Sequence, residues 1–266
     1  MSWQCSIGKM PMHYPPVILA DADNTLWDTD SVFADAQLAM LANVDQHFPG
    51  GEHLDPLAHV RAYDQALAQI DRRHLRYPPM LLVRALALGN LGHDAAAAAR
   101  MAIAQRPSGE LAGLQEGIVA AYFNALARIP ALLPGVADGL ELARRAGLDV
   151  WILTEGSADR QRTRAQVLGI ADLVKGVSEA AKSQDQFDRQ RRRFAPSSLV
   201  VIGDQPDRDI LPAQAAGCIG VLVPSRFRPG WIASTAWSAA DHIAERFDLA
   251  IDWVVSGDLT SSAAAE

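Results

Sequence analysis

The chain has 266 residues, of which 49% are apolar and 21% charged, proportions that are typical of a globular protein with a sizeable core. Its net charge of -7 argues against a general affinity for nucleic acid or anionic membranes, because both need a basic surface. The two cysteines, Cys5 and Cys218, lie far apart and have no metal-ligand spacing, which argues against a disulfide framework and a structural zinc site.

The N-terminal stretch MSWQCSIGKMPMHYPP lacks the basic start and apolar segment of a signal peptide. The most apolar helical stretch, PPMLLVRALALG, contains Arg84 and is too short to span a bilayer. Together with the low number of cysteines, these features predict a cytoplasmic protein that does not bind a membrane. No feature of the sequence points to a particular oligomeric state.

The first predicted strand is VILAD, residues 17–21, an apolar run that leads into a group of carboxylates. Asp21 and Asp23 lie two positions apart, and Asp28 and Asp30 follow shortly after them. Active sites of open α/β folds collect at the carboxyl ends of the strands. The acids therefore either solvate a loop or hold something cationic.

A helical segment follows, from about residue 31 to residue 129. It is rich in Ala and Leu, and the turn signals FPGGEHLDP, YPP, GNLGH and RPSGE divide it, so we expect four or five helices. An insertion of this length without a strand signal predicts a second domain. We assign residues 30–129 to this second, helical domain. We call it the cap, because we expect it to lie over the carboxyl ends of the strands.

Three further apolar runs predict strands at residues 148–154, 198–204 and 219–224. Helical patterns alternate with them over residues 135–147, 157–169 and 207–217, each ending in a glycine that suits a helix C-terminus. The alternation predicts an α/β Rossmann-like core, a parallel sheet with helices on both faces. This core would comprise residues 1–29 and 130–256, followed by a disordered tail at 257–266.

Each of the first three predicted strands ends in residue types that phosphoryl chemistry uses. Asp21 and Asp23 follow the first strand, Thr154 ends the second, and Asp204 ends the third, with Asp209 five residues later. Parallel strands of one sheet bring these ends side by side. We therefore expect residues that are distant in sequence to meet in one crevice.

The order of these motifs resembles the haloacid dehalogenase-like (HAD) superfamily, in its phosphatase branch with a helical (C1-type) cap. The first motif is DADNT at residues 21–25, the second is WILTEG with Thr154, and the fourth is VVIGDQPDRDI with Asp204 and Asp209. The resemblance of the core covers roughly residues 16–29 and 130–245.

The third motif of this family supplies a lysine. The segment GVSEAAKSQDQF resembles the family pattern and places the lysine at Lys182, with Ser183 in the position of a proline. Lys175 lies nearby and is the alternative. We prefer Lys182, because a phenylalanine follows it at the spacing of the family pattern.

The resemblance implies a Mg²⁺-dependent phosphatase that hydrolyses a small phosphomonoester, such as a nucleotide or a sugar phosphate, through an aspartyl phosphate. Asp21 would attack phosphorus, and Asp23 would act as general acid and then as general base. Asp21, the backbone carbonyl of Asp23, Asp204 and Asp209 would hold the Mg²⁺.

The same resemblance implies a phosphate site made of Thr154, Lys182 and the N–H groups of Glu155 and Gly156 before a helix. Family members often have asparagine where this chain has Glu155, which would add a negative charge near the phosphate unless the side chain points away. Family members often have glycine where this chain has Asn24, a mild change because asparagine tolerates the turns that glycine favours.

Two alternatives share this fold. A phosphomutase would form the same aspartyl phosphate and return it to a sugar, whereas a non-catalytic regulator would only bind a phosphorylated ligand. A haloacid dehalogenase fits less well, because members of the family with that activity lack an acid equivalent to Asp23.

The basic runs DRQRTR and DRQRRRF lie on predicted helices without interleaved aromatic residues. We therefore expect solvent-exposed helical faces at both places rather than a nucleic-acid site.

Overall fold

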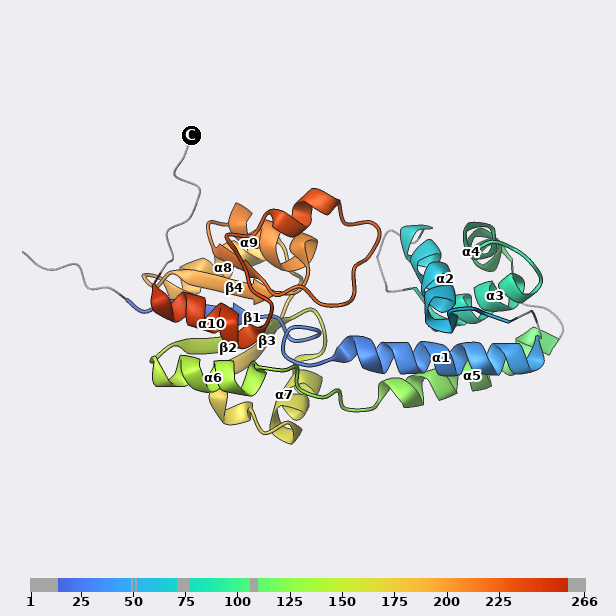
Figure 1. Ribbon diagram of the computed structural model, residues 1–266, viewed down its shortest axis with the longest axis horizontal. Helices are drawn as coiled ribbons and strands as arrows, with labels where there is room; N and C mark the ends of the chain where they lie inside the picture. The colour runs from blue at the N-terminus through green and yellow to red at the C-terminus, as the bar shows by residue number, and fades with distance from the viewer. Residues whose placement is uncertain (1–13, 49, 51, 71–76, 106–109, 258–266) are drawn as a thin grey trace, which may run out of the picture. The chain divides into compact units, whose positions relative to one another are not determined.

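The computed structural model describes residues 14–48, 50, 52–70, 77–105 and 110–257, so Cys5 and almost all of the predicted disordered tail lie outside the described residues. The chain divides into two compact units (Figure 1). One comprises Met1–Leu26, Pro134–Pro224 and Thr235–Glu266, and the other comprises Trp27–Leu133 and Ser225–Ser234. Across the described ranges, no helix is both long enough and apolar enough to traverse a bilayer.

The first unit is built on a parallel sheet of six strands in the order β3-β2-β1-β4-β5-β6. The strands are β1 (Val17–Ala20), β2 (Asp149–Thr154), β3 (Gly176–Glu179), β4 (Leu199–Gly203), β5 (Ile219–Leu222) and β6 (His242–Ile243). The predicted α/β class is therefore confirmed. Sequence analysis missed β3 and β6, the strands at the two edges of the sheet.

Helices cover both faces of this sheet. They are α6 (Val136–Arg145), α7 (Ala158–Val167), α8 (Gln184–Phe194), α9 (Leu211–Ala215) and α10 (Phe247–Ser256). The chain also has two short 3-10 helices, η1 (Ala171–Leu173) and η3 (Ser234–Ser238), and η3 begins at the last residue of the second unit. Phe187 of α8 and Ala213 of α9 pack on one face, against Val17, Leu19 and neighbouring strand residues. α6 packs against α10, and Figure 1 shows this pair on the other side of the strands.

The central strand fixes where the site forms. Ala20, the last residue of β1, is in register with Ile152 of β2 and Ile202 of β4. The Asp21 N–H continues the ladder by donating to the Ile202 carbonyl at 2.8 Å. Because β1 lies between β2 and β4, the residues that follow these three strands are neighbours at one edge of the sheet.

The segment after β4 departs from the expected regular helix over residues 207–217. A π-helix, η2 (Pro206–Ile210), comes first, and α9 follows it as a short α-helix. Single π turns inside helices are frequent at functional sites, because they redirect side chains that an α-helix would place elsewhere. Here the π turn carries Asp209.

The described part of the second unit contains five helices, which agrees with the four or five expected. They are α1 (Thr29–His47), α2 (Pro56–Ile70), α3 (Pro79–Asn90), α4 (Ala95–Ala104) and α5 (Glu110–Leu126). Their buried faces form one apolar core that includes Met40, Val60, Leu67, Leu86 and Ile118. Packing of these amphipathic faces, rather than helix propensity alone, stabilises helices of this length.

The two connections of the helical unit run side by side, because Trp27 forms an antiparallel bridge with Leu132. The Asp28 carboxylate caps α1 by accepting the Ser31 N–H at 3.0 Å, so this acid lies at the start of the first helix. Asp30 pairs with Arg61 of α2 at 2.7 Å. These two acids therefore stabilise the helical unit itself.

Residues 225–234 belong to the helical unit, although they follow β5 in the chain. At Gly230 an added Cβ would lie 3.2 Å from Gln65 Oε1 of α2, so this segment approaches the helix closely. Sequence analysis drew the helical domain at residues 30–129 and placed this segment in the core. No periodic pattern marks the segment, and its partners are distant in sequence.

Candidate active site

Asp21 is buried at the carboxyl end of β1 and is held by the turn that follows it. The Leu26 N–H donates to the Ala22 carbonyl at 2.9 Å and closes this turn. Asn24 has a φ of 64°, in the left-handed region that asparagine adopts more readily than most residues. The turn brings Thr25 Oγ1 to 3.3 Å from Asp21 Oδ2, so this hydroxyl orients the carboxylate.

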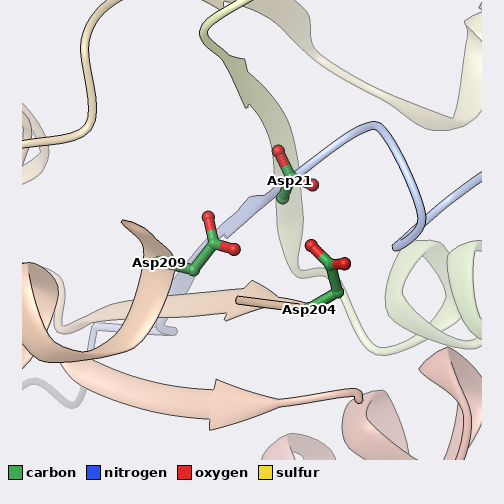
Figure 2. A group of neighbouring side chains, drawn as sticks. All are labelled: Asp21, Asp204 and Asp209. Carbon is green, nitrogen blue, oxygen red and sulfur yellow. The ribbon is translucent and has the colours of Figure 1, made fainter. Parts of the chain in front are cut away.

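Three buried carboxylates converge at this point (Figure 2). One oxygen from each of Asp21, Asp204 and Asp209 lies within 4.8 Å of the other two. Asp204 directly follows β4, and Asp209 comes from the π turn. Gly203 makes room for Asp209, because an added Cβ would lie 2.2 Å from Asp209 Cγ. The structure thus brings together the three acids that the motifs singled out.

Lys182 is the cation among these acids. Its Nζ contacts Asp21 Oδ1 and lies 2.5 Å from Asp209 Oδ1, and its side chain is buried. The alternative, Lys175, pairs instead with Asp149 at 3.3 Å, and both of these side chains are exposed. Asp149 begins β2, at the opposite end of the strand from Thr154. The structure therefore brings Lys182, and not Lys175, to Asp21.

The charges at this point are unbalanced. Burial opposes a charge on Lys182, but the Asp209 and Asp21 carboxylates outweigh it and raise the pKa of the ammonium, which therefore stays protonated. Burial also raises the pKa of Asp21; Lys182 opposes this shift, and Asp209 and Asp23 add to it. Three carboxylates beside one ammonium form a donor set that fits a hard divalent cation.

Thr154, at the end of β2, is buried, and its hydroxyl oxygen accepts hydrogen bonds from two neighbours. Its Oγ1 accepts from the Gly156 N–H at 3.0 Å and from Gln161 Nε2 at 3.3 Å. A hydroxyl oxygen accepts two hydrogen bonds, so the Thr154 proton is left to donate. The Gly156 N–H is engaged within the protein in this structure, and its direct contact with phosphate stays a prediction.

The Glu155 carboxylate points toward two partners in neighbouring loops. Its Oε2 lies 3.0 Å from Arg208 Nη1, and its Oε1 accepts the backbone N–H of Lys182 at 3.2 Å. The unusual acid at this position therefore has a counter-charge. Sequence analysis did not single out Arg208, although the residue lies inside the fourth motif, directly before Asp209.

The Asp23 carboxylate is held from α7. Its Oδ1 lies 2.8 Å from Arg164 Nη1, and its Oδ2 accepts from Gln161 Nε2 at 2.9 Å. The expectation that DRQRTR forms a solvent-exposed face is wrong for Arg164, whose side chain is only 11% exposed. Residues three apart share one side of a helix, and Gln161 and Arg164 face Asp23 together. The three-residue spacing of Gln161 and Arg164, on the helix that follows Thr154, was the feature of the sequence that could have identified them.

Comparisons with known proteins show which family the chain resembles. The profile of a family described as haloacid dehalogenase-like hydrolase matches residues 15–217. A curated relative, the phosphoserine phosphatase of Thermus thermophilus, is 32% identical over 117 residues, a stretch that covers 41% of this chain and 47% of the relative. The chain thus matches about half the length of that protein.

Solved structures share the fold. A HAD family hydrolase from Deinococcus radiodurans R1, solved with bound phosphate and sodium, is 19% identical, has a TM-score of 0.60, and is matched over 93% of this chain and 99% of that one. The putative HAD-hydrolase YfnB from Bacillus subtilis, solved bound to magnesium, is 16% identical, with a TM-score of 0.56 and coverage of 90% and 98%. At these identities the likeness concerns the fold alone.

Proposed function

Because the chain belongs to the haloacid dehalogenase-like hydrolase family, we propose that it is a Mg²⁺-dependent phosphatase that hydrolyses a small phosphomonoester through an aspartyl phosphate on Asp21. One observation carries the proposal. Asp21 lies in contact with Lys182 and beside Asp204 and Asp209, at the strand ends where Thr154 and Asp23 also lie.

In the first half of the proposed reaction, an Asp21 carboxylate oxygen attacks phosphorus, and the bond from phosphorus to the leaving oxygen breaks. The electron pair stays on that oxygen, which takes a proton from Asp23. Thr25 and Lys182 hold the Asp21 carboxylate in place during this step. The products of this half are an alcohol and the aspartyl phosphate.

In the second half, water attacks the phosphorus of the aspartyl phosphate while Asp23 takes a proton from that water. The bond between phosphorus and the Asp21 oxygen breaks, so inorganic phosphate leaves and the carboxylate is restored. The Thr154 hydroxyl proton and the Lys182 ammonium donate to phosphate oxygens and balance their charge. Asp23 therefore acts once in each half.

The donor set favours Mg²⁺ as the cation, because carboxylate oxygens are hard ligands. Asp21, Asp204, Asp209 and the backbone carbonyl of Asp23 would hold it. When bound, the ion supplies positive charge that offsets the repulsion between these carboxylates and an anionic substrate. YfnB, which shares the fold, was solved with magnesium.

For the substrate we propose a nucleotide or a sugar phosphate, with phosphoserine added because of the curated relative. The helical unit would serve as the cap that sets specificity. A phosphomutase would share the aspartyl phosphate, and it differs in producing an isomerised sugar phosphate faster than free phosphate.

The test is phosphate release from 4-nitrophenyl phosphate, phosphoserine, phosphoglycolate, a nucleotide and a sugar phosphate, with Mg²⁺ or with a chelator. We expect Mg²⁺-dependent release that Asp21→Asn lowers by roughly a thousandfold or more, because the nucleophile is lost. Asp172→Asn, a change to an exposed acid of η1, is the matched control and should keep full activity. Release that survives in Asp21→Asn, or no release from any compound by folded protein, would refute the proposal.

A further inference from the structure

We infer that Gln161 and Arg164, both in α7, are positioning residues that hold the general acid/base Asp23 and the phosphate-binding hydroxyl of Thr154 in fixed relation. This inference rests on the proposed function, because it assigns roles in that reaction. It adds two residues that lie outside the four motifs. Neither is expected to touch the reacting atoms.

Arg164 holds one oxygen of the Asp23 carboxylate. The Nη1 to Oδ1 distance is 2.8 Å, and the arginine side chain is 11% exposed while that of Asp23 is 37% exposed. A largely buried arginine loses much of its contact with water, so a charged partner is needed to compensate it. The pair therefore ties the loop after β1 to the helix after β2.

Gln161 joins this pair to Thr154. Its Nε2 donates to Asp23 Oδ2 at 2.9 Å and to Thr154 Oγ1 at 3.3 Å, and its Oε1 accepts from Arg164 Nη1 at 3.1 Å. The charges fix the orientation of the amide, because a flipped amide would present its oxygen to a carboxylate and its N–H groups to a guanidinium. Gln161 is buried, so these bonds replace its contacts with water.

Gly156 leaves the space in which these groups meet. An added Cβ at this residue would lie 3.3 Å from Gln161 Nε2, 3.4 Å from Thr154 Oγ1 and 3.9 Å from Asp23 Oδ2. The three polar atoms therefore converge beside a backbone that carries no side chain. This is an independent sign that α7 is fitted to Asp23 and Thr154 rather than only to the sheet.

The inference separates the two halves of the proposed reaction. 4-Nitrophenolate leaves without a proton, so the first half with 4-nitrophenyl phosphate does not need Asp23, whereas hydrolysis of the aspartyl phosphate does. A misplaced Asp23 should therefore lower kcat, because kcat depends on the rate of hydrolysis of the aspartyl phosphate. It should leave kcat/KM, which reports the first half, almost unchanged.

The experiment compares Arg164→Met with Arg162→Met, a control in the same helix whose exposed arginine pairs with Asp159 at 2.6 Å. With 4-nitrophenyl phosphate and Mg²⁺, we expect Arg164→Met to lower kcat by about tenfold or more and kcat/KM by less than about threefold. Acid-quenched Arg164→Met should contain more phosphorylated protein than wild type. Arg162→Met should match wild type in all three readouts.

Two further variants keep the test decisive. Arg164→Lys retains a cation and should recover part of kcat, whereas a residue needed only for its bulk would be served equally by methionine. Gln161→Glu is isosteric and removes the donors to both Asp23 and Thr154. It should therefore lower kcat/KM as well, through Thr154, but lower kcat further, through Asp23, so it replaces Arg164→Met if that variant does not fold.

Equal falls in kcat and kcat/KM, or wild-type values in both Arg164→Met and Gln161→Glu, would overturn the assignment. These outcomes differ from a failure of the proposed function. In that case wild type itself would release no phosphate from any compound, and the positioning role would fall with it.

Discussion

Arg208 pairs with the unusual acid Glu155 beside the candidate phosphate site. The Glu155 carboxylate lies 3.0 Å from the Arg208 guanidinium and also accepts the backbone N–H of Lys182. An uncompensated carboxylate here would repel a phosphate, whereas a paired one mainly orders the loop that carries Lys182. The pair thus couples the loops that follow β2, β3 and β4.

Arg208→Met should weaken the binding of inorganic phosphate, measured as its inhibition constant, by roughly threefold to tenfold, since partly exposed ion pairs contribute about 1 kcal/mol. Adding Glu155→Gln should restore the inhibition constant, because glutamine removes the charge and still accepts the Lys182 N–H. Arg144→Met, which breaks an Arg–Glu pair on the surface of α6, is the control and should have no effect. This account would be contradicted if the double variant bound inorganic phosphate more weakly than Arg208→Met.

The close contact between the end of β4 and the π turn of η2 is what places Asp209. The Asp209 N–H donates to the Gln205 carbonyl at 2.8 Å, and the Gln205 N–H donates back to Asp209 Oδ2 at 3.0 Å. Asp209 can approach Lys182 only because residue 203 has no side chain, as an added Cβ would overlap its Cβ and Cγ. The glycine is therefore required for close approach, not for a turn.

Gly203→Ala should displace Asp209, raise the Mg²⁺ concentration needed for half-maximal phosphate release, and lower release by about tenfold or more. It should also lower the free energy of unfolding by roughly 1–3 kcal/mol, the usual effect of overpacking. Gly113→Ala on α5, where an added Cβ meets nothing within 4 Å, is the control and should be neutral or slightly stabilising. Unchanged Mg²⁺ dependence in Gly203→Ala would show that Asp209 does not need this contact.

The elements that sequence analysis identified are those with a strong apolar signal. β1 and β4 are buried along their whole length and read as apolar runs. The edge strands β3 and β6 were missed because each has one neighbour and little burial; β3 has a single buried residue, Val177. The sequence of α8 is mostly basic and polar, and only Phe187 and Gln190 are buried in it, so its apolar signal is weak.

At the scale of the whole molecule, the order of the strands explains why the placement of several candidate site residues was predictable from the sequence. A parallel sheet brings its strand ends to one edge, and β1 lies between β2 and β4, so Asp21, Thr154 and Asp204 are placed at neighbouring strand ends. Arg164 and Arg208 were not predictable in the same way. Their partners depend on which side of a helix or turn faces the site, and DRQRTR alone does not reveal that.

The grouping of residues 225–234 with the helical unit is a second feature of the whole chain that local patterns do not carry. The segment starts two residues after the sheet residue Val223, whose N–H donates to the Gly203 carbonyl at 2.9 Å, yet it approaches α2 at Gln65. Such contacts join residues that are far apart in sequence, so only a folded structure shows them.

The most direct measurement is to locate the phosphate on the protein during turnover. The protein would be mixed with 4-nitrophenyl phosphate and Mg²⁺, quenched in acid and digested, and the phosphorylated peptide identified by mass spectrometry. We predict one phosphorylated residue, Asp21, and no phosphopeptide from Asp21→Asn. Phosphate release without a phosphorylated protein, or a phosphate on another residue, would contradict the proposed mechanism.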